Sequence, residues 1–319
     1  MPGVTTPPAP VSFSEFEAMF ERLKNWGKWG PEDERGTMNY LTPDKIAAAA
    51  RLVRSGRSVS MSIPINKVAG PDNPSPAVHH MSLLHDIPIS ESGLTFAMCY
   101  LGMVSHGDCH THVDALNHVG WKGQLYNGKP TSTLTSKGST WGSITAYHTG
   151  IVGRGVLIDA ARHRGVDWLE PGDAVTRAEI EAIEKDIGLT LGEGDILVFR
   201  TGHHARRLAL GGWDNDYPPK GEGKAGLHVD TVPWMRERKI AAFLPDGDGE
   251  TVPSNCEHVP YPIHVLQLVA MGMLISDSLQ LEDLAAACAA ESRWEFMVAG
   301  LPLRLPGATG SPWNPIAIF

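Results

Sequence analysis

The sequence predicts an α/β fold in which a mixed β-sheet is flanked by helices, and three observations favour this class. Apolar stretches of strand length alternate with helical patterns throughout the second half of the chain. Hydrophobic residues make up 42% of the 319 residues and charged residues 20%, which is enough for a large core. No repeat and no composition shift marks an internal boundary. We therefore expect a disordered, Pro-rich tail at 1–11 and a single domain over 12–319.

Local signals in the first half of the chain predict two helices, two strands and a loop. Ser12 and Glu15 form a capping box before apolar residues spaced by three and four, and Thr42-Pro43 opens the second helix. Alternating side chains predict a half-buried strand, and a longer apolar run predicts a fully buried one. A segment rich in Pro, Asn and Ser is typical of a loop that reaches over a pocket. The half-buried strand, the loop and the buried strand are 57–63, 69–78 and 94–104.

The second half of the chain carries most of the expected regular structure. Thr176 and Glu179 form a second capping box at the start of a helix. The expected strands are 151–159, 194–202, 240–248, 273–277, 296–305 and 315–319. The expected helices are 176–188, a short one that ends at 234–238, 262–271 and 281–290.

Charge, cysteine content and missing motifs exclude several classes of function. The formal net charge is −9 and no basic run is present, which argues against nucleic acid as a partner. The four cysteines form no C-x-x-C pair, so we expect reduced thiols in a cytoplasmic protein. We find no secretory signal and no apolar stretch of about 18 residues, so no membrane partner is expected. The chain also lacks the G-x-S-x-G of serine hydrolases, and no G-x-G-x-x-G follows a predicted strand.

Residues 105–118 concentrate four histidines and two aspartates in one short span. On an extended strand, in which side chains alternate, these six would share one face. They are His106, Asp108, His110, His112, Asp114 and His118. Imidazole and carboxylate groups are ligands that suit Zn, Mn or Fe. A solvated face with incidental histidines is the alternative, and the apolar surroundings favour the metal site.

A catalytic metal site needs about three protein ligands and one open position. His112, Asp114 and His118 supply two imidazoles and one carboxylate, and either His110 or His106 could complete the shell. A metal with an open position lowers the pKa of its water from about 15.7 to near 7, which produces a nucleophile at neutral pH. Such a site predicts hydrolysis of an amide, an ester or a lactone.

The motif Thr-His-Val-Asp-Ala-Leu-Asn-His at 111–118 resembles the core of the metal-dependent cyclase family. That family includes bacterial kynurenine formamidases and isatin hydrolases, with the pattern His-x-Gly-Thr-His-x-Asp-x-Pro-x-His. Further segments resemble it at 36–43, 151–159, 194–202 and 310–319. The resemblance implies the family's fold and a hydrolase of carbon–nitrogen bonds in a small-molecule substrate, similar to arylformamidase. It also implies a divalent transition metal, Mn or Zn, and a homo-oligomer, either a dimer or a tetramer.

Position by position, the resemblance implies roles for five residues. His112 and Asp114 match metal ligands, and His118 matches the last motif histidine, a ligand of a second metal or a catalytic group. His264 resembles a later catalytic histidine, and Asp277 stands where the family often has a glutamate. In the implied mechanism His118 or His264 takes a proton from the water and returns it to the leaving group. Asp277 orients one of these histidines or binds a second metal.

Three positions depart from the family pattern. Asp108 stands in place of the first motif histidine, His110 in place of the glycine and Leu116 in place of the proline. The missing ligand is then His106, His110 or Asp108, and a carboxylate there would shift the preference towards Mn. The expected metal ligands are His106, His110, His112 and Asp114, and the expected catalytic residues are His118, His264 and Asp277.

Other functions are open to the same residues. A lactone hydrolase or a metal-dependent lyase would use the same site, and the departures from the pattern also suit a non-catalytic protein that binds a metal or small molecule. Trp121 and Phe243 are candidates for stacking on a flat substrate. His203-His204 is better explained as a helix start than as a ligand pair. The acids at 246–250 lack the spacing of a twelve-residue calcium loop, so we expect a turn.

Overall fold

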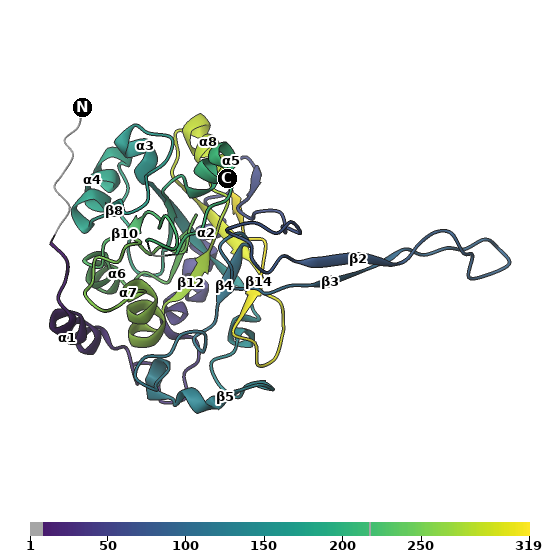
Figure 1. The fold of residues 1–319 in the computed structure, drawn as a ribbon. Coiled ribbons are helices and arrows are strands. Elements are labelled where there is room, and N and C mark those ends of the chain that lie inside the picture. Colours follow the sequence, from purple (N-terminus) through teal and green to yellow (C-terminus); the bar gives the residue numbers. More distant parts are fainter. Residues whose placement is uncertain (1–8, 217) are drawn as a thin grey trace.

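The structure, a computed structural model that describes residues 9–216 and 218–319, confirms the predicted α/β class (Figure 1). Within these residues nine strands form one mixed sheet, in the order β1-β15-β13-β7-β9-β11-β12-β4-β14. In that order the strands are Ser58–Ser60, Ile316–Ile318, Glu295–Gly300, Ile151–Asp159, Ile196–Arg200, Ala242–Pro245, Leu274–Asp277, His112–Asp114 and Gly310–Pro312.

The middle of the sheet is parallel and its two sides are antiparallel. β7, β9, β11 and β12 pair with one another in parallel. β13, β15 and β1 continue the sheet on one side, and β4 and β14 on the other. All residues of β9, β11 and β12 are buried, because parallel strands are covered on both faces. The edge of this buried region is where β12 meets the short strand β4.

Helices begin where the capping signals predict them. The Ser12 hydroxyl accepts from the Glu15 amide, and a Glu15 carboxylate oxygen accepts from the Ser12 amide at 2.9 Å, which confirms the first capping box. His203 opens a helix, as expected for the adjacent histidines. The helices are α1 (Phe13–Leu23), α2 (Pro43–Ala50), α3 (Ala160–Arg164), α4 (Arg177–Ile187), α5 (His203–Leu210), α6 (Thr231–Arg238), α7 (Pro262–His264), the π-helix η5 (Val265–Met271) and α8 (Glu282–Glu291).

The remaining elements of the body are short. Two-residue strands pair as β5 (Leu134–Thr135) with β6 (Gly138–Ser139) and as β8 (Ala174–Val175) with β10 (Gly226–Leu227). Single-turn helices are η1 (Gly36–Tyr40), η2 (Tyr126–Gly128), η3 (Thr131–Thr133) and η4 (Ile144–Tyr147). Most of the tail expected at 1–11 lies outside the described residues. No described helix has the length and apolar character needed to cross a membrane.

The buried strand expected at 94–104 is wrong. β3 (Met98–Gly102) pairs instead with β2 (Val78–Leu83), and the two-stranded ribbon projects away from the body (Figure 1). All residues of the ribbon are exposed or only half-buried. An apolar run favours burial, but the other described parts of this chain do not cover it. The loop expected over a pocket lies partly beside a different cavity, which residues 69–72 line together with Arg207.

Candidate metal centre

A cavity of about 520 Å³ brings most of the predicted site residues together at the edge of the sheet. Its polar wall comes from β4, from the loops on both sides of β4, from α7 and from the end of β12. The predicted site residues in this wall are His106, His112, His118, His264 and Asp277. Asp114 is fully buried against them.

The pairing of β4 with β12 brings two distant segments into contact. In this antiparallel register His112 lies opposite Asp277, so the two side chains share a face of the sheet. His112 Nε2 is 3.6 Å from Asp277 Oδ2. Alternation along β4 places Asp114 on that face too, and Asp114 Oδ1 is 3.6 Å from the same His112 nitrogen. The alternation expected from the sequence therefore holds within β4.

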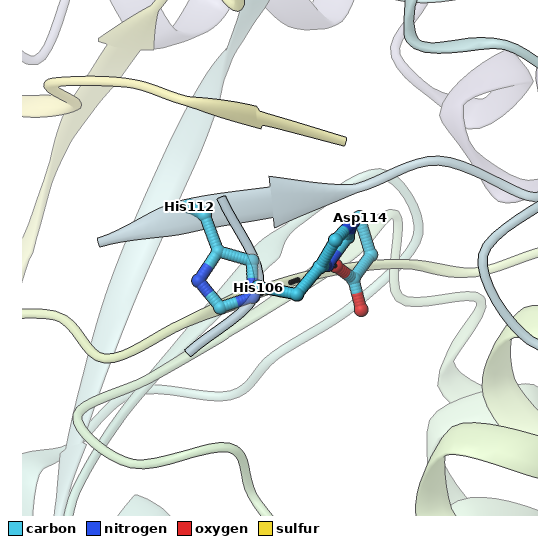
Figure 2. Close-up of side chains that lie close together, drawn as sticks. All are labelled: His106, His112 and Asp114. Atoms are coloured by element: carbon cyan, nitrogen blue, oxygen red, sulfur yellow. Dashed lines mark ion pairs between the residues drawn. The ribbon is translucent and has the colours of Figure 1, made fainter. Parts of the chain in front are cut away.

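His106 and His118 reach the cluster from outside the strand. β4 is only three residues long, and the chain turns on both sides of it. His106 Nδ1 lies 2.9 Å from Asp114 Oδ1, as Figure 2 shows, and His106 Nε2 lies 2.9 Å from Thr309 Oγ1. The His118 ring stacks on that of His106 with centroids 3.7 Å apart, and His118 Nε2 is 3.8 Å from Asp114 Oδ2. Turns, rather than a continuous strand, bring these two histidines together.

His110 and Asp108 lie apart from the other predicted ligands. The His110 amide donates to the Gly107 carbonyl at 3.3 Å, so the chain is turned here and side chains do not alternate. The His110 ring bonds through Nε2 to the Asn66 carbonyl at 3.0 Å. Asp108 is partly exposed at the cavity wall, with Oδ1 3.7 Å from Lys224 Nζ. Of the three candidates for the missing ligand, the structure brings His106 alone beside Asp114.

His264 is held from behind by a buried glutamate. Glu250 Oε1 accepts from the His264 amide at 2.8 Å and lies 3.0 Å from His264 Nδ1. This pair of contacts turns the other ring nitrogen towards the cluster. His264 Nε2 is 3.5 Å from Asp277 Oδ2 and 3.9 Å from Asp114 Oδ2. The sequence showed Glu250 only as part of an acidic turn, so its contact with His264 was not anticipated.

The residues form two ligand sets that share one carboxylate. The first set is His106, His112 and Asp114, and the second is Asp114, His264 and Asp277. Within each set the candidate ligand atoms lie within 4.8 Å of one another. Both Asp114 oxygens and Asp277 Oδ1 are buried without a hydrogen-bond partner. Unpaired buried carboxylate oxygens are costly, and imidazole with carboxylate suits Zn or Mn. The residues present therefore fit a divalent transition metal.

Electrostatics separate the roles of the titratable groups. Burial opposes ionisation of Asp114, but the surrounding imidazoles hold the pKa of its carboxyl well below the usual range. Burial lowers the pKa of His118 to about 4, and the neighbouring histidines add to this against the pull of Asp114. For His264, burial is outweighed by hydrogen bonds to Asp277 and Glu250, which raise its pKa well above the usual value. His118 is thus neutral at pH 7 and can accept a proton or bind a metal.

Other residues of the cavity wall were missed or misplaced by the sequence argument. Asp248 lines the cavity and pairs with Lys224, an ammonium that is almost entirely buried. A signal existed, because the acids at 246–250 follow β11, which is parallel to β12, so both strands end at the same edge. Trp121 lines the cavity as expected for a stacking residue. Phe243 does not line it, because its ring is buried in the core.

Comparison with known proteins gives three informative matches. A family model described as "Putative cyclase" matches residues 37–248. A crystal structure described as a novel cyclase is 37% identical, with a TM-score of 0.82, over 94% of this chain and 99% of that one. Isatin hydrolase A from Ralstonia solanacearum shares the fold at 20% identity and a TM-score of 0.60, over 86% of this chain and 97% of that one. A search of curated protein sequences found no match.

Proposed function

This chain belongs to the cyclase family, and on that premise we propose that it is a metal-dependent hydrolase of carbon–nitrogen bonds. The proposed substrates are amides, formamides or cyclic imides, as for an arylformamidase. One observation carries the proposal: two ligand sets share Asp114 at the wall of a cavity large enough for a small molecule. The fold shared with isatin hydrolase A supports the choice of a cyclic amide among the substrates to be tested.

The chain's own residues divide into those that hold an ion and those that move protons. His106, His112 and Asp114 would hold one ion, and Asp114 with His264 and Asp277 would hold a second. When bound, a divalent ion such as Mn or Zn lowers the pKa of a water molecule and polarises a carbonyl oxygen.

His118 is the proton carrier in this proposal. Its side chain is 29% exposed, whereas that of His112 is 5% and that of His264 is 8%, so it is the most accessible of these three rings. Stacking on His106 fixes the plane of the His118 ring. Because the His118 imidazole is neutral at pH 7, it accepts a proton from the attacking water and returns it to the leaving nitrogen.

The apolar part of the cavity suits a flat ring. Trp121, Val119, Val259 and Pro260 line it together with the polar residues. An indole face offers an aromatic substrate a stacking surface, and aliphatic side chains exclude water from the reacting carbonyl. The acyl group would then face the histidines while the ring contacts this apolar wall.

A substrate panel tests the proposal directly. N-formyl amines, cyclic imides, lactones and isatin would be incubated with the metal-free protein, with added Mn and with added Zn. We expect turnover of at least one carbon–nitrogen substrate only with metal, and a product heavier than the substrate by one water. Elemental analysis of the purified protein should show stoichiometric transition metal. Turnover restricted to lactones, a product without added water, or no metal and no turnover would each refute the proposal.

A further inference from the structure

The ribbon of β2 and β3 forms an ordered arm, which we define as residues 78–104. Its strands are paired from Val78 opposite Gly102 to Leu83 opposite Met98. Hydrogen bonds continue to the tip, where the Ile89 amide donates to the Leu94 carbonyl at 2.8 Å. The arm extends far beyond the sheet and helices of the body (Figure 1). It is therefore a built element of the fold that finds no cover within its own chain.

Both faces of the arm are apolar. On one face Val78, Met98 and Tyr100 are 57%, 55% and 52% exposed. On the other face Met81 and Leu101 are each 47% exposed. An antiparallel ribbon that packs on a core with one side and meets water with the other shows apolar and polar residues in alternation. This arm lacks that alternation, so both of its faces call for a partner surface.

The apolar area of the arm matches a protein interface in size. Among the described residues, eleven of the twenty-three exposed large hydrophobic side chains lie within the arm. At about half exposure they offer on the order of 700 Å² of apolar surface, close to the ~800 Å² that each partner buries in a standard interface. A two-stranded hairpin is at best marginally stable alone in water, so contact with a partner also stabilises the ribbon itself.

The charge pattern of the arm favours a second copy of this chain as the partner. The whole chain carries a net charge of −9, so two copies repel each other over much of their surfaces. The arm has no lysine or arginine, and its acidic residues are Asp86 and Glu91. A nearly uncharged apolar surface can meet its own copy without like-charge repulsion. A membrane-binding hairpin would instead carry basic residues for anionic lipids.

We propose that the arm is a reciprocal clasp through which two copies of this chain form a dimer. In a twofold arrangement each copy offers the same surface and receives the same surface in return, so both arms are covered at once. The proposal does not depend on the chemistry at the metal centre. It assigns a function to the segment where sequence reasoning expected a buried strand: the strand is buried by the partner.

The oligomeric state of matched variants tests the clasp. Met81→Asp with Tyr100→Asp places one charge on each face of the arm. The control is Val166→Asp, because Val166 is as exposed as Met81 at 47% but lies in the body. A second variant replaces 79–101 by Asn-Gly, since Val78 and Gly102 are paired neighbours and a two-residue turn can join them. Light scattering after size exclusion and sedimentation velocity would measure mass from about 1 to 50 μM.

We expect the parent and Val166→Asp to have twice the 34.5 kDa chain mass, and both arm variants to have the chain mass. Circular dichroism and the thermal midpoint should show that the arm variants keep the folded body. A monomeric parent at 50 μM overturns the proposal, as does an arm-deleted variant that keeps the dimer mass. A monomeric parent that sediments with phosphatidylcholine or phosphatidylserine vesicles would assign the arm to lipid and would equally overturn it.

Discussion

Glu250→Gln is the most informative substitution, because it alters the support of His264 without touching the cavity. The substitution keeps the shape of the side chain and one carbonyl oxygen, which can still accept from the His264 amide and ring. It removes the negative charge from a residue that is fully buried. The contacts at 2.8 and 3.0 Å then change from charge-assisted to neutral hydrogen bonds.

The size of the effect follows from those two bonds. A charge-assisted hydrogen bond contributes about 1.5–3 kcal/mol and a neutral one about 0.5–1.5 kcal/mol, so the pair weakens by about 2–3 kcal/mol. Loss of a carboxylate that orients a ligand histidine typically lowers metal affinity or activity by about 10–100-fold, which is the same range in free energy. We therefore expect Glu250→Gln to weaken metal binding by about 10–100-fold.

Competition with a fluorescent chelator would measure the affinity of Mn and Zn for the parent and variant. Glu257→Gln is the matched control, because Glu257 belongs to the same stretch of chain and is exposed. In a His264→Ala background the effect of Glu250→Gln should disappear, since the two residues act as one unit. An affinity within twofold of the parent, or an undiminished effect without His264, would refute the reasoning.

Three further predictions concern the ligand sets. His106→Ala should lose metal in elemental analysis, whereas His110→Ala should keep it, because only the His106 ring lies beside Asp114; the opposite pattern would assign the missing ligand to His110. His118→Ala should lower turnover by about 10²–10⁴-fold while most metal is retained, with the exposed His148→Ala as control; loss of both metal and turnover would make His118 a ligand instead. Dialysis against a chelator should lower the thermal midpoint, and Mn or Zn at about 100 times its dissociation constant should restore about 2.7 kcal/mol of stability; an unchanged midpoint would contradict a metal bound to the folded state.

Local sequence signals predicted the interior of the fold well. The apolar runs of β7, β9 and β12 fall within the expected ranges, because a central parallel strand is buried on both faces by helices of the same chain. The arm escaped prediction for the same physical reason. An apolar run shows that a strand needs cover, but it does not show whether that cover comes from the chain itself.

The site was predictable only where it is local. His112 and Asp114 share a face because they alternate on one strand, and this can be seen in the sequence. His106 joins them through a turn, and the same turn carries His110 away, which alternation cannot anticipate. Glu250 lies 14 residues before His264, and its role depends on how the intervening loop folds back. Tertiary geometry, rather than spacing, decides such contacts.

The position of Asp114 in both ligand sets has a thermodynamic consequence. Two sites that share a carboxylate do not have independent binding constants, because occupancy of one changes the charge and orientation of the group presented to the other. Linkage requires that the coupling be reciprocal: the factor by which the first ion alters the affinity for the second also applies in reverse. A metal titration of this protein is therefore described by two macroscopic constants and one coupling free energy, and replacing the ion in one set shifts the midpoint measured for the other.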